Sequence, residues 1–348
     1  MTPTPALTSA LKSLSGRINL SAAETEAAVT EVLSGGVPDA AVAAFLTGLR
    51  VKGETADELA GAVQAVRGRV ASGGLRMPAL GVLDTCGTGG DGAQTVNIST
   101  AAAVVVAACG VPVAKHGNRA ASGNSGSAEV LTEFGIDVEA SPALLNRCMA
   151  ELGIAFLFAP KFHPGLRSVA GVRRQLPFRT LFNLVGPLAN PAGPEYQLLG
   201  VAGVVQARLV ADALARLGTT RSAVVTGADG LDEVSLSGPT HVFVVERGAV
   251  SERLWTPEDF GLGRISTADL RISGPSDSAR RIRQMLAGEP GPVRATVLAN
   301  AAAALWVVTG MGLRDSIDRA GEAIDTGRAD KLLDDWSALC RSAADSAL

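Results

Sequence analysis

From about residue 80 onward, short apolar runs alternate with longer stretches of helical periodicity. The apolar runs cover residues 82–83, 111–114, 154–158, 198–201, 223–225 and 242–245. Short buried strands that alternate with helices are typical of β-α-β units, which build parallel sheets. We therefore predict that residues 76–348 form a large α/β domain with a mostly parallel central sheet.

The N-terminal part of the chain carries helix signals instead. Ser21 and Glu24 have the spacing of a capping box, in which each side chain bonds the other residue's backbone N–H. Ala, Leu and Val recur at helical spacing, which predicts a small all-helical domain over residues 1–75. The Pro- and Gly-rich residues 183–196 indicate a connection between domains, and we expect a segment near 170–195 to return to the helical domain.

The charge and cysteine content restrict the partners and the compartment. With a net charge of −3, the chain lacks the basic surface expected for binding nucleic acid or an anionic membrane. The N-terminus has no signal-peptide pattern, and the longest purely apolar run, 101–109, is far below the ~20 residues of a membrane span. Four scattered cysteines without a C-x-x-C pair suit reduced thiols. We expect a cytoplasmic protein without nucleic-acid or membrane partners.

Polar clusters follow directly on four of the predicted strands. They comprise residues 86–100, 115–127, 159–163 and 227–233. In open α/β sheets, ligands bind beyond the carboxyl ends of the strands. We expect the four clusters to converge on one cleft.

The first cluster, CGTGGDGAQTVNIST, contains a literal G-x-G-x-x-G that starts at Gly87. A dinucleotide site would need an acid about 20 residues further on, where this chain has Gly-Val-Pro-Val-Ala. A P-loop would need Gly-Lys-Ser/Thr, which is missing. Exposed backbone N–H groups followed by a helix start at Asn97 offer two anion sites, which suit a ligand with two phosphate groups. A surface turn is the alternative, and Asp91 would repel phosphate unless a metal or a sugar hydroxyl intervenes.

The remaining clusters add charge of both signs. Lys115 lies in a Ser- and Gly-rich loop that suits phosphate, although a solvated loop would look similar. Arg173, ten residues after His163, could bind a carboxylate or simply face solvent. Asp232 and Glu233 suit Mg²⁺ held together with substrate phosphates, or else an acidic turn.

No nucleophile beside a base, zinc spacing or catalytic carboxylate pair stands out. A site of this kind works by positioning its substrates and by stabilising charge on a leaving group. Transfer from a phosphorylated sugar with a diphosphate leaving group fits these parts. Attack of phosphate on a nucleoside fits them too.

Several long motifs resemble the anthranilate phosphoribosyltransferase family. They include GTGGDGAQTVNIST, KHGNR, FLFAPKFHPGLRSVAGVRRQLPFRTLFNLVGPLANPAG and GLDEVS, and the resemblance runs from about residue 40 to about residue 310. It implies a small helical domain beside an α/β domain, and a homodimer joined through the helical domain. It also implies that the anthranilate amine displaces diphosphate from phosphoribosyl diphosphate (PRPP), a step of tryptophan biosynthesis, with Mg²⁺ as cofactor, two ions per monomer.

The same resemblance assigns roles to individual residues. It implies PRPP binding by Gly87, Gly90, Asp91, Thr95, Asn97, Ile98, Ser99, Thr100, Lys115, His116, Gly117, Asn118, Arg119, Ala120, Ala121, Ser122, Gly123 and Ser127. It implies anthranilate binding by Gly87, Asn118, His163, Arg173 and Pro187. It implies metal binding by Ser99, Asp232 and Glu233.

The chain departs from the family pattern at three positions, and two other functions have to be weighed against the resemblance. Gly123 stands where the family often has Ser, Glu129 where it has Asp, and Pro177 where it has Gly. A pyrimidine nucleoside phosphorylase shares the fold, but it binds free phosphate and has no need of Asp232 and Glu233. A non-catalytic, nucleic-acid-binding relative should be basic, unlike this chain.

Overall fold

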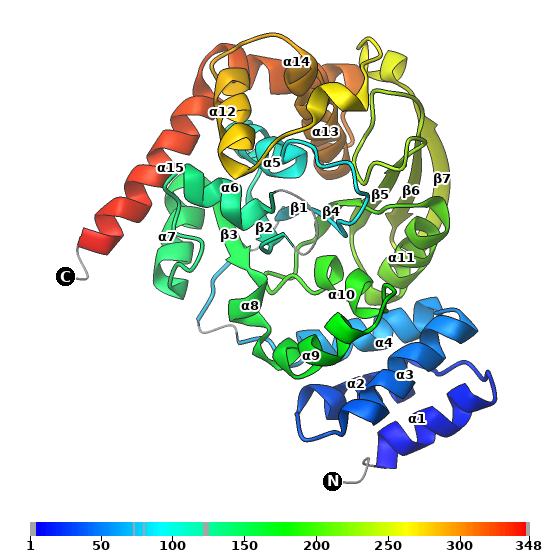
Figure 1. Ribbon diagram of the computed structural model, residues 1–348. Coiled ribbons are helices and arrows are strands. Elements are labelled where there is room, and N and C mark those ends of the chain that lie inside the picture. Colours follow the sequence, from blue (N-terminus) through cyan, green and yellow to red (C-terminus); the bar gives the residue numbers. More distant parts are fainter. Residues whose placement is uncertain (1–4, 72–73, 79–80, 121–124, 346–348) are drawn as a thin grey trace.

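A small helical lobe lies beside a larger α/β lobe in the computed structural model, which describes residues 5–71, 74–78, 81–120 and 125–345 (Figure 1). The N-terminal helices of the small lobe are α1 (Pro5–Ser15), α2 (Ala22–Leu33), α3 (Asp39–Lys52) and α4 (Ala56–Arg67). The described structure thus confirms the fold class, with helices alone at the N-terminus and a sheet after residue 80.

Local sequence signals set the ends of these helices. The capping box at Ser21 and Glu24 starts α2, and both of its hydrogen bonds are present. Gly53, at φ +92°, ends α3 in a conformation that favours glycine. A Cβ at Gly61 of α4 would lie 2.1 Å from the carbonyl oxygen of Ala22, so α2 and α4 pack backbone to backbone at this point.

The central sheet of the large lobe has seven strands in the order β3-β2-β1-β4-β5-β6-β7. The first five strands in sequence run parallel to one another, whereas β6 is antiparallel to β5 and β7 is antiparallel to β6. Their bounds are β1 (Leu83–Gly87), β2 (Val113–Gly117), β3 (Ile154–Phe158), β4 (Tyr196–Gly200), β5 (Arg221–Gly227), β6 (Thr240–Glu246) and β7 (Ala249–Trp255). Six of the seven were predicted within a few residues, and β7 was missed.

Helices cover both faces of the sheet, as Figure 1 shows. Between β1 and β4 the chain forms α5 (Ile98–Ala108), α6 (Ser127–Glu133), α7 (Pro142–Leu152), α8 (Ala159–Phe162), η1 (Pro164–Leu166), α9 (Arg167–Gln175) and α10 (Phe182–Leu188). After β4 it forms α11 (Val204–Leu217), η2 (Pro257–Phe260), η3 (Thr267–Leu270), α12 (Pro275–Leu286), α13 (Pro292–Thr309), α14 (Leu313–Asp325) and α15 (Arg328–Asp345).

Alternation along the strands divides the core between the two faces. On β5, Ala223 and Val225 belong to the cluster that packs against α5 and α13, while Val224 belongs to the cluster on the opposite face. That second cluster includes α11 and continues without a break into the helical lobe. We call it the shared core, because one set of buried side chains serves the sheet and the N-terminal helices.

Helices α9 and α10 come late in the sequence but pack on the small lobe. Helix α9 contacts α2 and α3, and α10 contacts α4. Arg67, the last residue of α4, donates from Nε and Nη2 to the carbonyl oxygen of Leu188 at 2.9 and 2.6 Å. The segment that carries Arg173 and Pro187 is therefore fixed to the helical lobe.

Helix α13 is the one helix in the described part of the chain that is long and apolar enough to cross a membrane, with a mean hydropathy of 1.3. Of its residues, 67% are buried within the protein, where the helix packs against α5 and α14. Its composition is that of a central core helix.

Candidate active site

The order of the strands reverses between β1 and β4. β2 and β3 lie on one side of β1, whereas β5 lies beyond β4 on the other. Such a switch point leaves a crevice beyond the carboxyl ends of the strands, and ligands bind there in open α/β sheets. Two segments meet at this crevice, the glycine loop (88–97) after β1 and the acidic loop (228–239) after β5.

The glycine loop is hydrogen-bonded to the end of β4 and to the acidic loop. The N–H of Thr88 donates to the carbonyl oxygen of Gly200 at 2.9 Å. The N–H of Gly89 donates to Oδ2 of Asp232 at 2.7 Å. The structure therefore brings together two of the predicted clusters that lie more than a hundred residues apart.

Glycines at two strand ends make room for Asp232. A Cβ at Gly200, the last residue of β4, would lie 1.6 Å from the backbone oxygen of Asp232. A Cβ at Gly87, the last residue of β1, would lie 2.8 Å from Oδ2 of the same residue. The acidic loop can approach both strands because neither of them ends in a side chain.

Ser99, at the start of α5, lies between a carboxylate and an ammonium group. Its N–H donates to Oε1 of Glu233 at 3.1 Å, and its Oγ accepts from Nζ of Lys115 at 3.2 Å. Nζ of Lys115 also donates to the carbonyl oxygen of Thr85. Lys115 is buried, and burial lowers its pKa against the opposing charges of nearby carboxylates.

Burial and neighbouring negative charge disfavour the ionised forms of Asp232 and Glu233 in the acidic loop. Burial, followed by the charge of Asp91, raises the pKa of Asp232 to about 7. Burial, followed by the charge of Asp232, raises the pKa of Glu233 to about 8. Carboxylates crowded in this way attract a cation, and oxygen ligands are those that Mg²⁺ prefers. The described residues contain no group of three or more His, Cys, Asp or Glu side chains placed to hold a metal.

Asp229 takes a different role from its neighbours in the acidic loop. Its Oδ2 accepts hydrogen bonds from Ser235 at 3.0 Å, Ser237 at 2.6 Å and Thr267 at 2.5 Å. These hydroxyl groups use the carboxylate to shape the loop. The structure thus separates Asp229 from Asp232 and Glu233.

The start of α5 is tied to two other segments through Asn97. Its N–H donates to Oγ of Ser278 at 3.1 Å, and that hydroxyl donates back to Oδ1 of Asn97 at 2.7 Å. Ser125 Oγ donates to the same Oδ1 at 2.8 Å. Further into the helix, Ile98 is buried in the core, and Oγ1 of Thr100 is buried with no hydrogen-bond partner among the described residues.

The loop after β2 is tightly packed where the structure describes it. Oγ of Ser127 donates to the carbonyl oxygen of Asn118 at 3.2 Å. A Cβ at Gly117 would lie 2.3 Å from that Oγ, so the end of β2 needs a glycine. Thr95, across the site, pairs with Arg271 in an isolated antiparallel bridge. The predicted PRPP residues Ala121, Ser122 and Gly123 lie outside the described residues.

Glu129, one of the three departures from the family pattern, has a local role. Its carboxylate accepts from the N–H groups of Gly126 at 3.1 Å and Ala120 at 3.1 Å, which caps α6. Arg119 lies at the surface and pairs with Glu139 at 3.4 Å. The longer glutamate therefore closes this loop through backbone contacts of its own.

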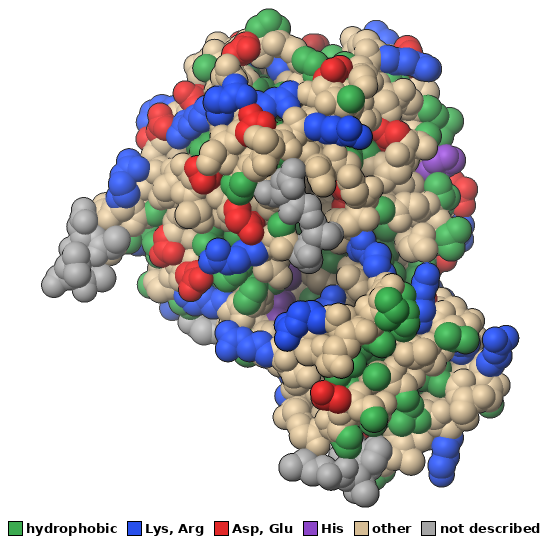
Figure 2. Space-filling view, viewed as in Figure 1, with side chains coloured by type: hydrophobic (Ala, Val, Ile, Leu, Met, Phe, Trp, Pro, Cys, Tyr) green, Lys and Arg blue, Asp and Glu red, His purple; other side chains and the backbone are tan. Residues whose placement is uncertain are grey.

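Two buried histidines meet beneath the crevice. The rings of His116 and His163 are 5.2 Å apart at 74°, and Nδ1 of His116 lies 3.1 Å from the carbonyl oxygen of Gly186. Pro187, also buried, is the next residue of α10. Burial lowers the pKa of His116 to about 3 and that of His163 to about 4, so both rings are neutral at pH 7. Figure 2 shows histidine surface at the base of the hollow between the two lobes.

Arg173 lies on α9, with its guanidinium 5.9 Å from the centre of the Phe182 ring. Burial, followed by the charge of Arg179, lowers the pKa of Arg173. Helix α9 ends at Gln175 just before Pro177, a second departure, because a proline disfavours helical conformation in the preceding residue. The proline acts as a helix stop on the way to Arg179.

Sequence reasoning missed Arg179 and Ser278. Arg179 donates from Nη1 to the carbonyl oxygen of Gly89 at 2.6 Å and from Nη2 to that of Thr88 at 3.1 Å. A single arginine after a helix forms no pattern, and Ser278 lies far from Asn97 in the sequence. Arg179 does lie within a long motif shared with the family, but nothing in that motif indicates its contact with Gly89.

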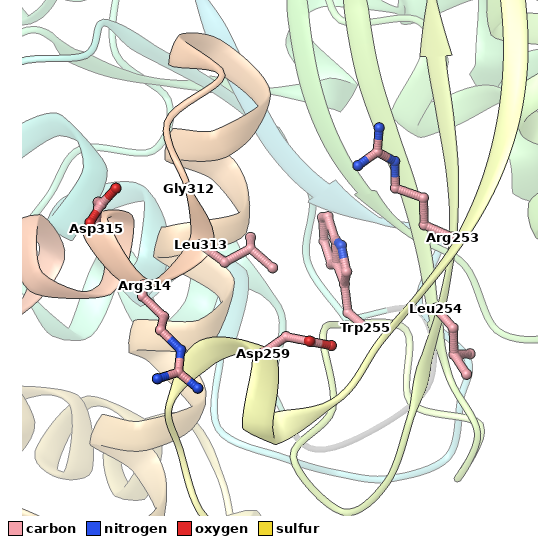
Figure 3. A pocket seen from close by; sticks show the side chains of 8 residues that line it. All are labelled: Arg253, Leu254, Trp255, Asp259, Gly312, Leu313, Arg314 and Asp315. Atoms are coloured by element: carbon pink, nitrogen blue, oxygen red, sulfur yellow. The ribbon is translucent and has the colours of Figure 1, made fainter.

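A separate surface cleft of about 510 Å³ lies between β7 and the start of α14 (Figure 3). Trp255, Arg253 and Arg314 are among the residues that line it. None of its lining residues belongs to the predicted site.

Two family models match the two lobes. The glycosyl transferase family helical bundle domain matches residues 8–70, and the glycosyl transferase family a/b domain matches residues 80–330. The anthranilate phosphoribosyltransferase of Anaeromyxobacter sp. (strain Fw109-5) is 48% identical over 326 residues, which cover 93% of this chain and 96% of that protein. The enzyme of Novosphingobium aromaticivorans is 46% identical over 320 residues, 92% of this chain and 96% of its own length.

Solved structures show the same likeness. The crystal structure of anthranilate phosphoribosyltransferase from Thermus thermophilus matches with a TM-score of 0.89 at 39% identity, and covers 95% of this chain and 99% of that one. The Saccharomyces cerevisiae enzyme, in complex with PRPP and Mg, matches with a TM-score of 0.88 at 29% identity, and covers 97% and 98%. The yeast enzyme has also been solved with 4-fluoroanthranilate.

Proposed function

Since this chain belongs to the anthranilate phosphoribosyltransferase family, we propose that the crevice between β1 and β4 is where it binds both substrates. The family's reaction is a step of tryptophan biosynthesis. It transfers the phosphoribosyl group of PRPP to the amine of anthranilate, giving N-(5-phosphoribosyl)anthranilate and diphosphate. One observation carries the proposal for this chain. Asp232 accepts a hydrogen bond from the backbone of the glycine loop, and its neighbour Glu233 accepts one from the backbone at the start of α5.

The donor side consists of groups that bind phosphate and sugar. The backbone N–H groups of the glycine loop and of the α5 N-terminus are anion donors, and Lys115 adds positive charge beside them. The hydroxyl of Thr100, which has no hydrogen-bond partner within the described part of the chain, adds a donor at the same helix start. Asn118 and Arg119, in the loop after β2, contact PRPP from the side opposite the glycine loop. Together with the remaining residues assigned above, these groups form the PRPP site.

The residues present fit a magnesium site. Asp232 and Glu233 supply two buried carboxylates whose pKa values are raised by burial and by neighbouring carboxylates, and Ser99 adds a hydroxyl beside them. Two Mg²⁺ ions per monomer would hold the diphosphate group and offset the negative charge that it gains when it leaves. Asp91, next to Asp232, contributes to the same negative field.

The acceptor side consists of Arg173, His163, Asn118, Pro187 and Gly87. The Arg173 guanidinium pairs with the anthranilate carboxylate. The neutral His116 and His163 rings and the buried Pro187 form an apolar wall for an aromatic ring. An aromatic amine is already nucleophilic at neutral pH, so the site needs no strong general base, and catalysis rests on positioning.

The proposal extends to the domains and to the assembly of the protein. The helical domain comprises residues 1–75 with the returning segment near 170–195, supported by the contacts of α9 with α2 and α3, and residues 76–348 form the PRPP-binding domain. The protein is a cytoplasmic homodimer joined through the helical domain. The side chains of Ile18 and Val51 in that domain are 61% and 63% exposed, which suits a surface that another copy covers.

A fluorescence assay tests the function directly. Protein, PRPP and Mg²⁺ are mixed with anthranilate, and the loss of anthranilate emission is followed. We expect loss only when all components are present. The absence of a Mg²⁺-dependent loss of emission would refute the proposal, and phosphate-dependent cleavage of a pyrimidine nucleoside in its place would favour the nucleoside phosphorylase.

A further inference from the structure

Gly89 is hydrogen-bonded through both of its backbone polar groups. Its N–H donates to Oδ2 of Asp232 at 2.7 Å, and its carbonyl oxygen accepts from Nη1 of Arg179 at 2.6 Å. Nη2 of Arg179 extends the contact to the carbonyl oxygen of Thr88 at 3.1 Å. One guanidinium thus spans two successive peptide groups of the glycine loop.

The glycine loop is shaped to admit this guanidinium. A Cβ at Gly90 would lie 1.8 Å from Nη1 of Arg179, so the side chain occupies space that only a glycine leaves open. Gly90 also has φ +79°, a conformation that favours glycine. Two independent features therefore favour glycine at position 90, and one of them is the space that Arg179 occupies.

The base of Arg179 is anchored away from the glycine loop. The next residue, Thr180, is buried, and its N–H donates to Oδ1 of Asn183 at 2.8 Å. Leu181 is buried in the shared core. Because the backbone is fixed, the guanidinium contact holds the glycine loop to the segment that also carries Arg173.

Arginine and lysine differ at such a site in how they donate hydrogen bonds to two neighbouring carbonyl oxygens. A guanidinium can donate two hydrogen bonds in a fixed fork, whereas an ammonium acts as a point charge. Here the two hydrogen bonds of Arg179 set the orientation of the backbone at Thr88 and Gly89. The N–H of Gly89 in turn sets the position of the Asp232 carboxylate.

We propose that Arg179 is a positioning residue for the phosphoribosyl donor, acting through Gly89 to orient Asp232 and the glycine loop. The inference rests on the proposed roles of the glycine loop and Asp232. It assigns Arg179 to the PRPP and metal side of the reaction, although Arg173, six residues earlier, serves the acceptor.

Three variants test this assignment. Arg179→Gln removes the charge and the fork, and Arg179→Lys keeps the charge alone. Arg174→Gln, an exposed arginine at the end of α9, is the matched control. For each variant we would measure the KM for PRPP, the KM for anthranilate, the half-saturating Mg²⁺ concentration and the melting temperature.

We expect Arg179→Gln to raise the KM for PRPP and the half-saturating Mg²⁺ concentration by about tenfold, as for the loss of a charged hydrogen bond. The KM for anthranilate should change by less than about threefold, and Arg179→Lys should recover only part of the loss. The control should match the wild type. A larger change in the KM for anthranilate than in the KM for PRPP would overturn the proposal. A lower melting temperature with both KM values unchanged would overturn it too.

A double variant separates this inference from the metal assignment. If Arg179 acts through Asp232, adding Arg179→Gln to Asp232→Asn should raise the KM for PRPP by less than about threefold further. A full additional tenfold would overturn the proposed route through Asp232. If Asp232→Asn alone leaves Mg²⁺ dependence unchanged, the metal role fails, and the PRPP effect of Arg179→Gln then decides the positioning role by itself.

Discussion

The imidazole rings of His116 and His163 meet edge to face at 5.2 Å, and neither residue is more than 5% exposed. Both come from segments beside the predicted acceptor site, one from the end of β2 and the other from the turn after α8. Because both rings are buried and neutral, protonation of either ring opposes folding.

The histidine pair predicts an acid-sensitive fold. Unfolding raises the pKa values of His163 and His116 from about 4 and about 3 to about 6.5, so the unfolded chain binds more protons below pH 6.5. The free energy of unfolding should then fall by about 1.4 kcal/mol per pH unit for each histidine between pH 6.5 and the folded pKa. Urea unfolding at several pH values measures this slope.

The variant His163→Phe keeps a ring in place and should flatten the decline between pH 6.5 and 5. The control His241→Phe changes the third histidine, on β6, and should leave the slope as it is. An equal slope in His163→Phe and wild type would show that the pair does not carry the effect.

Gly200→Ala should disrupt the acidic loop. The new Cβ would lie 1.6 Å from the backbone oxygen of Asp232, so the loop must move away from β4. We expect a rise in the half-saturating Mg²⁺ concentration, and a loss of stability of about 1–3 kcal/mol from overpacking. Steady-state kinetics over a Mg²⁺ titration, together with thermal unfolding, would measure both.

Gly321→Ala on α14 is the control, since nothing lies within 4 Å of its Cβ position. In a helix interior it should stabilise by about 0.5–1 kcal/mol. Normal Mg²⁺ dependence in Gly200→Ala would contradict the contact with Asp232.

The different partners of the acidic residues predict a separation of function. Asp232→Asn should weaken Mg²⁺ binding at the crevice and so raise the half-saturating Mg²⁺ concentration, because it removes a buried negative charge from the proposed ligand set. Asp229→Asn changes a carboxylate that three hydroxyl groups use, so it should lower the melting temperature and leave the half-saturating Mg²⁺ concentration unchanged. The same Mg²⁺ response in both variants would refute this division.

Arg173→Ala should affect the acceptor alone. Loss of a bidentate partner for a carboxylate should raise the KM for anthranilate by about tenfold or more, while the KM for PRPP changes little. Initial rates with one substrate varied at a time give both constants. Equal changes in the two would remove Arg173 from the acceptor site.

The sequence pointed to those parts of the candidate site that follow local rules. The glycine loop and the acidic pair could be found because both follow apolar strands, and glycine and carboxylate patterns carry their own chemistry. The start of α5 was predicted from Asn97 and the apolar run behind it, and the structure begins that helix at Ile98.

Other features depend on contacts that no local pattern encodes. The strand β7 escaped prediction because it is an antiparallel edge, and its sequence AVSERLW is mostly exposed. Asp229 resembles Asp232 in sequence, but the hydroxyl groups around it come from three positions that only the fold brings together. The contact of Arg179 with Gly89 joins residues 90 positions apart.

The shared core has a consequence for how the protein unfolds. Its buried side chains run from Leu7 in α1 through α4 and α9 to Val224 on the sheet. Residues 1–75 alone would therefore expose apolar faces that α9, α10 and α11 cover in the whole chain. Despite the two-lobed outline, we expect the protein to unfold as one cooperative unit, and calorimetry should record a single transition rather than separate melting of each lobe.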